Sequence, residues 1–104
     1  MKSYKIVITR PASQDLLEIA RYSSNELREP ATARKLIGRI KEAVMSLAEM
    51  PIRHALVADE RLAARGIRKL PVENYIIFYV ISDKTSVVTI VRILYGRRDW
   101  ISLL

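Results

Sequence analysis

The chain of 104 residues contains no cysteine, one histidine and three glycines. Without cysteine it cannot form disulfides or a thiolate site for zinc or iron–sulfur, and one histidine cannot build a multi-histidine metal site. The longest apolar run, Tyr75–Ile81, is far shorter than the ~20 residues that cross a bilayer. Residues 1–10 alternate polar and apolar side chains and lack a signal-peptide core. These absences predict a soluble cytoplasmic protein without a metal, a cofactor or a membrane partner.

The composition predicts one compact domain over residues 1–104, because half of the residues are hydrophobic and single cores typically serve ~100–150 residues. Lysine and arginine number 18 against 11 acidic residues, a net charge of +7. Such an excess attracts polyanions: nucleic acid, an acidic protein or an anionic membrane surface. Both halves of the chain are basic, so the charge does not belong to a disordered arm.

The first half of the chain predicts a strand followed by two helices. Residues 4–9 alternate and place Tyr4, Ile6 and Ile8 on one face of a strand. Thr9 can cap a helix that begins near Pro11. The buried positions expected on this helix have three-four spacing: Ala12, Leu16, Ile19, Ala20, Ser23 and Leu27.

A second helix is expected between the Pro30 break and the Met50-Pro51 stop. Its apolar residues also follow helical spacing: Ala33, Leu36, Ile37, Ile40, Val44 and Leu47. Gly38 either marks a close helix contact or is an exposed glycine that the helix tolerates. Because the break is short, the two helices should form an antiparallel hairpin that packs on something flat.

The second half predicts a polar connector and an antiparallel sheet. Residues 52–66 lose their periodicity and can contain a helical turn. Three strands follow, over 67–70 or 67–72, 75–82 and 87–95, and they should form an antiparallel meander. The middle strand is apolar on both faces, as expected between the hairpin and another layer. A short helix over 99–104, capped by Asp99, completes an α+β fold.

The familiar catalytic signatures are absent, including the P-loop, the dinucleotide-binding glycine turn and the metalloprotease histidine pair. His54 is expected to be an ordinary loop residue. The basic residues of the last third alternate with aromatic ones: Arg68, Lys69, Arg92, Arg97 and Arg98 with Tyr75, Tyr79, Tyr95 and Trp100. Such a combination suits phosphate and unstacked bases.

A structural interpretation of each of these residues is also open. Strand alternation places Arg68 and Lys69 on opposite faces of the sheet. On this interpretation Arg68 and Arg92 cover sheet edges or pair with Glu73 or Asp99, and the tyrosines belong to the core. Trp100 is expected to pack beneath the final helix.

Three segments of the last third carry a family resemblance: Gly66-Ile67-Arg68-Lys69-Leu70, Asn74-Tyr75-Ile76-Ile77-Phe78-Tyr79 and Val91-Arg92-Ile93-Leu94-Tyr95-Gly96-Arg97-Arg98-Asp99. With the preceding strand and helices, this succession resembles the RelE/ParE superfamily of type II toxin–antitoxin toxins over essentially the whole chain. The resemblance implies a bacterial, cytoplasmic, growth-inhibiting toxin of the plasmid-stabilisation kind. It also implies a hetero-oligomer with an acidic antitoxin that wraps over the toxin.

The superfamily contains metal-free endonucleases that cleave mRNA on the ribosome and ParE-type toxins that poison DNA gyrase. Lys69 matches a sheet lysine of the RelE type, and Arg98 matches the arginine after its last strand. Ile76 stands where RelE-type enzymes have an arginine, and residues 102–104 lack their tyrosine. The resemblance therefore favours the ParE-like branch and a non-catalytic gyrase inhibitor.

Two alternatives remain open, so the sequence does not decide whether the protein is an enzyme. A ribosome-dependent mRNA endonuclease would use Lys69, Arg97 and Arg98 with Tyr95 or His54 as acid–base partner. A degenerate, non-toxic module would only bind its antitoxin. The residues expected to contact the target or the antitoxin are Arg68, Lys69, Arg92, Arg97, Arg98 and Trp100. The partner site is expected to be an apolar groove rimmed by arginines that binds an acidic segment.

Overall fold

The computed structural model describes residues 3–26 and 29–104. Strand β1 (Lys5–Ile8) is followed by helices α1 (Arg10–Glu26) and α2 (Pro30–Ser46). The connector contains a 3₁₀ helix η1 (Pro51–Arg53) and a short helix α3 (Glu60–Ala64). The remaining elements are β2 (Arg68–Val72), β3 (Tyr75–Ser82), β4 (Val87–Tyr95) and a second 3₁₀ helix η2 (Ile101–Leu103).

Helix α1 begins where the sequence predicts, because Thr9 caps it. The Ala12 amide donates to Thr9 Oγ1 at 3.2 Å, which satisfies one of the free amides of the first turn. The Thr9 hydroxyl donates to the Val91 carbonyl at 3.0 Å. The same side chain therefore starts the helix and attaches its beginning to β4.

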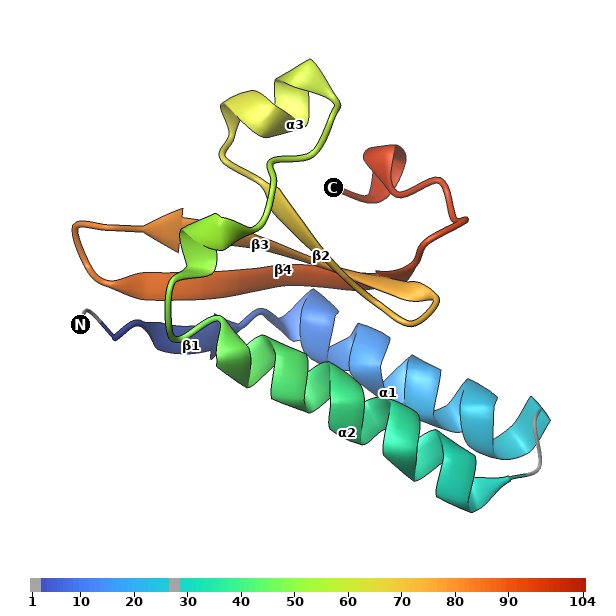
Figure 1. The fold of residues 1–104 in the computed structure, drawn as a ribbon. Coiled ribbons are helices and arrows are strands. Elements are labelled where there is room, and N and C mark those ends of the chain that lie inside the picture. The colour runs from blue at the N-terminus through green and yellow to red at the C-terminus, as the bar shows by residue number, and fades with distance from the viewer. Residues whose placement is uncertain (1–2, 27–28) are drawn as a thin grey trace.

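The two helices form the expected hairpin, which lies along one face of the sheet (Figure 1). On α2 the predicted stripe faces inward, with Ala33, Ile40 and Val44 buried. Gly38 is exposed, and a Cβ atom built on it would meet nothing within 4 Å, so it does not mark a close helix contact. Leu27, predicted for the stripe of α1, lies outside the described residues.

The sheet contains the predicted antiparallel strands and is mixed, because the N-terminal strand joins them in parallel. Strands β2, β3 and β4 form the predicted meander, but β1 adds to the edge of β4 in parallel, with Lys5 opposite Val87 and Ile8 opposite Ile90. Hydrophobic alternation sets which face a strand buries but carries no information on the direction of its partner. Of the three residues expected on one face of this strand, Tyr4 and Ile6 pack on the cluster beneath the hairpin, whereas Ile8 is 44% exposed.

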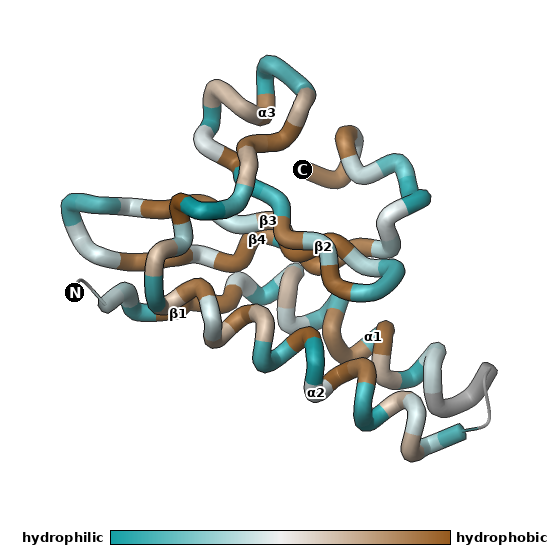
Figure 2. The backbone as a smooth tube through the Cα atoms, in the orientation of Figure 1, coloured by the Kyte–Doolittle hydropathy of each residue, from teal (hydrophilic) through white to brown (hydrophobic). Residues whose placement is uncertain are grey.

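The core has two parts, one on each face of the sheet, as the doubly apolar β3 predicts. Ile77 and Tyr79 belong to the cluster beneath the hairpin, whereas Phe78 belongs to a second cluster beneath α3 and the C-terminal segment. Figure 2 shows hydrophobic residues gathered along β3 and β4 between these two layers. The sheet thus separates two environments, and a side chain's position along a strand decides which of them it enters.

The second layer consists of the connector and the C-terminal segment. Asp59 caps α3, because the Leu62 amide donates to its Oδ1 at 3.0 Å. The predicted C-terminal helix is a single 3₁₀ turn, and Trp100, not Asp99, occupies its N-cap position. Asp99 instead accepts from the Ser102 hydroxyl at 3.2 Å. So short a segment favours the tighter 3₁₀ form.

Asp15 on α1 joins the hairpin to β4. Its carboxylate is 5% exposed and accepts from Arg92 Nε at 2.7 Å and from Arg92 Nη2 at 2.8 Å. The same carboxylate accepts from the Ile93 amide at 3.0 Å, at a point on the β4 edge that β1 does not reach. The hydrogen bond to Asp15 raises the pKa of Arg92, against the opposing effect of burial. Arg92 was expected to pair with Glu73 or Asp99; Glu73 pairs instead with Arg39.

We expect Asp15→Ala to lower the free energy of unfolding by about 3 kcal/mol, because it leaves a partly buried arginine and a buried amide without their acceptor. Urea unfolding measures this loss. Glu18→Ala on the same helix is the matched control, since Glu18 is exposed and its removal should cost less than about 0.5 kcal/mol. Equal losses in the two variants would contradict the role of Asp15.

Candidate binding groove

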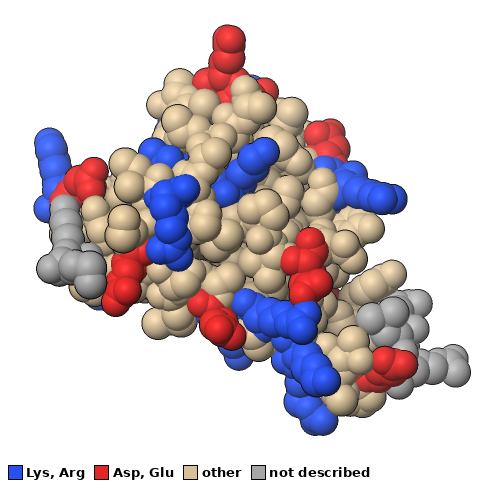
Figure 3. Space-filling model, viewed as in Figure 1, with Lys and Arg blue, Asp and Glu red and all other residues tan. Residues whose placement is uncertain are grey.

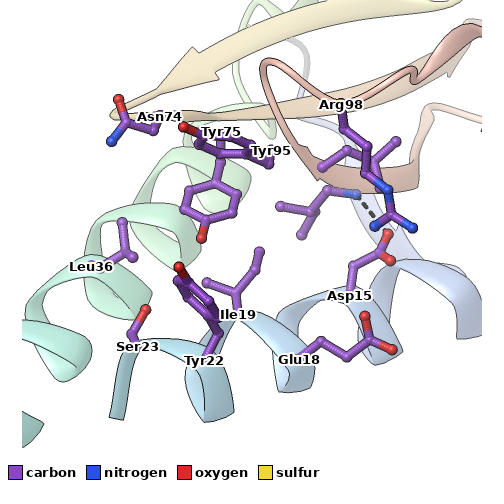
Figure 4. Close-up of a pocket in the computed structure, with 12 residues that line it drawn as sticks. Asp15, Glu18, Ile19, Tyr22, Ser23, Leu36, Asn74, Tyr75, Tyr95 and Arg98 are labelled. Atoms are coloured by element: carbon purple, nitrogen blue, oxygen red, sulfur yellow. Dashed lines mark hydrogen bonds between the residues drawn. The ribbon is translucent and has the colours of Figure 1, made fainter. Parts of the chain in front are cut away.

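An open groove of about 580 Å³ lies between the helical hairpin and the ends of β3 and β4 (Figure 4). Ile19 of α1, Leu36 of α2 and Ile93 of β4 give it an apolar lining. Tyr22, Tyr75 and Tyr95 add aromatic rings from three different elements. The groove exists because the hairpin extends beyond the sheet, so its far half has no strands above it (Figure 1).

The three tyrosines form one wall of the groove. Tyr75 and Tyr95 are cross-strand neighbours whose rings meet edge to face, with centroids 5.8 Å apart. Tyr22 of α1 is 60% exposed, and Figure 4 shows its hydroxyl pointing toward that of Tyr75. Burial raises the pKa of Tyr75, and the neighbouring Tyr22 and Tyr95 raise it further. The Tyr75 phenol therefore stays neutral near pH 7 and can donate a hydrogen bond.

The other end of the groove is charged. Asp15 contributes its carboxylate, which is fully engaged with Arg92 and Ile93. Arg98 follows β4 and its side chain reaches toward α1 in Figure 4. Within the described part of the chain Arg98 is exposed and makes no ion pair. The groove is therefore apolar with Asp15, Glu18 and Arg98 at its charged end, and it lacks the rim of arginines expected from the sequence.

The structure places the residues that the endonuclease alternative would use on different faces of the sheet. Lys69 alternates with Leu70, which packs on the hairpin side, and lies opposite Phe78 of the second cluster. Lys69 is therefore on the α3 side of the sheet, whereas Arg98 lines the groove on the hairpin side. Tyr95 lines this groove as well. Arg97 is exposed in the turn after β4.

Two of the expected contact arginines are engaged within the fold. Arg92 forms the ion pair with Asp15. Arg68 Nη1 donates to the His54 carbonyl at 2.7 Å and fastens the connector to β2. Trp100 is partly buried and packs on Phe78, with ring centroids 5.1 Å apart, as the core interpretation predicts. Among the described residues, the side chains of Lys69, Arg97 and Arg98 make no hydrogen bond or ion pair, unlike those of Arg68 and Arg92.

His54 differs from the ordinary loop residue expected. It is half-buried, and its ring meets Tyr79 edge to face with centroids 6.4 Å apart. Its Nε2 is buried and has no hydrogen-bond partner among the described residues. Burial lowers the pKa of His54, and the nearby Arg53 lowers it further. Tyr79 donates its hydroxyl to the Pro51 carbonyl at 2.6 Å, and burial raises its pKa to about 12.

Charge is distributed over the visible face of the molecule rather than concentrated. Figure 3 shows basic side chains at several separate places, with acidic side chains between them. In the described residues no group of three or more histidine and acidic side chains could hold a metal ion. No helix in the same residues is long and apolar enough to cross a membrane.

Sequence reasoning missed several residues of the groove. Asp15, Tyr22 and Asn74 were not expected to contribute to a site. Asp15 carries a recognisable signal, because it lies three residues after Ala12 and four before Ile19 on the buried stripe. An acidic residue at such a position requires a basic or amide partner. Tyr22 carries no such signal, because its role depends on where the sheet ends above the hairpin.

Comparison with known proteins identifies related folds. The family model described as "ParE toxin of type II toxin-antitoxin system, parDE" matches residues 6–100. A solved chain of the chromosomal ParDE system from P. aeruginosa is 24% identical, with 91% of this chain and 98% of that chain covered and a TM-score of 0.73. No curated protein matches the sequence.

Two further solved structures share the fold. A chain of the toxin–antitoxin complex RelBE2 from Mycobacterium tuberculosis is 20% identical, with 89% of this chain and 98% of that chain covered and a TM-score of 0.62. A mutant of the E. coli toxin RelE in the free state is 12% identical, with 97% and 92% covered and a TM-score of 0.68. At these identities the likeness shows the fold and not the activity.

We expect the stability of the protein to fall as the pH drops below about 6.5, the ordinary pKa of histidine. The unfolded chain then binds a proton at His54, whereas the folded protein, in which this pKa is lowered, resists protonation until a lower pH. Urea unfolding between pH 8 and pH 5 measures the effect. His54 is the only histidine, so His54→Gln should remove this part of the pH dependence; an unchanged profile would refute it.

Proposed function

The chain belongs to the ParE toxin family of type II toxin–antitoxin systems, and we propose that it inhibits DNA gyrase when it is free. In the cell an acidic antitoxin holds it inactive in a hetero-oligomer in the cytoplasm. The toxin acts by binding and is not itself an enzyme. The observation that carries the proposal is the ParE family match over residues 6–100, which includes most of β1, the helical hairpin and strands β2, β3 and β4.

The positions of the basic residues support binding over RNA cleavage. Metal-free cleavage of RNA needs a base, an acid and a cation gathered around one phosphate. Lys69 lies on the α3 side of the sheet and Arg98 on the hairpin side, so these two residues do not face a common site. The position early in β3 where a RelE-type arginine is expected is the apolar Ile76, which packs in the second cluster.

The charge of the chain supports an acidic antitoxin. The net charge of +7 attracts an acidic protein and raises its association rate. The groove provides the apolar surface that a folding segment needs. Arg98 lines the same groove and makes no ion pair with residues 3–26 or 29–104. We infer that the antitoxin covers this groove and that its negative charge offsets part of the basic surface.

We expect expression of the toxin without antitoxin to arrest growth, and the purified protein to inhibit supercoiling by gyrase while ribosome-bound mRNA stays intact. Supercoiling assays and mapping of mRNA ends, done in parallel, measure the two activities. Toxin mixed with its antitoxin before the assay is the control and should leave gyrase active.

Two results would contradict this proposal in different ways. Cleaved mRNA with normal supercoiling would make the protein an endonuclease, and Lys69→Ala and Arg98→Ala would then test which side chains sustain cleavage. Normal growth, intact mRNA and normal supercoiling would identify an antitoxin-binding module without toxicity.

A further inference from the structure

The outer edge of β4 is paired over only part of its length. Strand β1 covers it from Val87 to Ile90, and the Thr9 amide makes the last of these main-chain bonds, to the Ile90 carbonyl at 3.1 Å. The chain then leaves the sheet to form α1. Beyond this point the Ile93 amide donates a hydrogen bond to the Asp15 carboxylate at 3.0 Å. The carboxylate thus replaces a strand at one position of the edge.

Two main-chain groups further along this edge point into the groove. The Gly96 amide points toward β3 and donates to the Asn74 carbonyl at 2.8 Å. The Ile93 amide points the opposite way and donates to the Asp15 carboxylate. Because main-chain groups of successive residues alternate between the two sides of a strand, the Ile93 carbonyl and the Tyr95 amide also point away from β3. Both residues line the groove. The edge therefore presents one acceptor and, two residues later, one donor.

This pattern fits a parallel strand. In a parallel pair, each bonded residue lies opposite a partner residue on the other strand. Its amide donates to the carbonyl of the residue before that partner, and its carbonyl accepts from the amide of the residue after that partner. The Ile93 carbonyl and the Tyr95 amide flank Leu94 in this way. An antiparallel strand would instead use both main-chain groups of Ile93 or of Tyr95. The Ile93 amide is taken by Asp15, and the Tyr95 carbonyl accepts from the Arg98 amide at 3.0 Å.

The side chains around this edge indicate what kind of segment would bind. One residue of the bound segment would lie opposite Leu94. The side chains before and after that residue would point to the same face of the sheet as Ile93 and Tyr95, where the groove is apolar and aromatic. Arg98 reaches toward Asp15 at the charged end of the groove, which Glu18 also lines (Figure 4), and it makes no ion pair among the described residues. An extended segment with two apolar residues in alternation and a nearby carboxylate would complement this surface.

We propose that the Ile93–Tyr95 edge binds an extended segment of the acidic antitoxin as a short strand parallel to β4, in line with β1. The inference rests on the antitoxin partnership of the proposed function but not on gyrase as the target. In this complex the main chain of Ile93 and Tyr95 hydrogen-bonds to the antitoxin segment. The groove binds the apolar side chains of the segment, and Arg98 pairs with a carboxylate of the segment.

The test is Tyr95→Pro, measured as antitoxin affinity with the full-length antitoxin encoded beside this chain. Proline removes the Tyr95 amide, which points away from β3, so no bond of the β3–β4 ladder is lost. Tyr95→Phe keeps the amide and the ring and is the matched control. We expect the proline variant to bind about tenfold more weakly or worse, and the phenylalanine variant to bind within about twofold of the wild type.

Amide hydrogen exchange on the wild-type protein keeps the test valid even if the proline variant does not fold. The Tyr95 amide should exchange at least about tenfold more slowly in the antitoxin complex than in the free toxin. Tight antitoxin binding with unchanged exchange at Tyr95, or equal affinities of the proline and phenylalanine variants, would overturn the inference and leave the antitoxin partnership intact. Protection of Tyr95 that grows with toxin concentration alone would assign the edge to a second copy of this chain. Absence of antitoxin binding would overturn both proposals.

Discussion

The Asp15 carboxylate is the interaction on which the arrangement of this molecule depends. It is buried, and it accepts three hydrogen bonds, two from the Arg92 guanidinium and one from the Ile93 amide. A buried carboxylate is tolerated only when it is paired and hydrogen-bonded, so α1 can lie only where these donors meet it. Thr9, six residues earlier, fixes the beginning of the same helix to Val91. Two adjacent polar contacts thus set the position of the helical hairpin on the sheet.

The groove follows from this attachment. Asp15 and Thr9 hold the first half of α1 against β4, and the rest of the hairpin continues past the strand ends (Figure 1). The space between them is lined by Ile19, the three tyrosines and Arg98. The Asp15 carboxylate accepts from the Ile93 amide, and the pairing of β4 with β1 ends at Ile90. Within the described chain, the part of the β4 edge left for another strand is therefore the part that faces the groove. The same contact therefore supports the fold and limits where another chain can pair with the sheet.

Much of the fold could be predicted from the sequence because its elements have strong local signals. The helical spacing of Ala33, Ile40 and Val44 predicts α2, and Thr9 before Pro11 predicts the beginning of α1. The doubly apolar β3 predicts a layer on each face of the sheet. The parallel pairing of β1 could not be predicted, because it depends on the path of the intervening helices and not on the pattern of residues 5–8.

The candidate site was less predictable, because its residues come from separate elements. Basic residues were expected to form it, yet Arg92 and Arg68 are engaged within the fold by Asp15 and the His54 carbonyl. An arginine on a strand looks the same in sequence whether its partner is a neighbouring helix or another molecule. Tyr22 and Tyr75 meet only because the hairpin extends past the sheet. Asp15 alone carried a local signal, as an acidic residue on a buried helical stripe.

A double-mutant cycle of Asp15→Ala and Arg92→Ala tests most directly that the Asp15 carboxylate holds α1 against β4. The free energies of unfolding of the wild type, the two single variants and the double variant give the coupling between the two side chains. The account predicts a coupling of at least about 1.5 kcal/mol, because each single variant leaves the other charge without its partner in a partly buried place. Additive losses, with a coupling below about 0.5 kcal/mol, would contradict it.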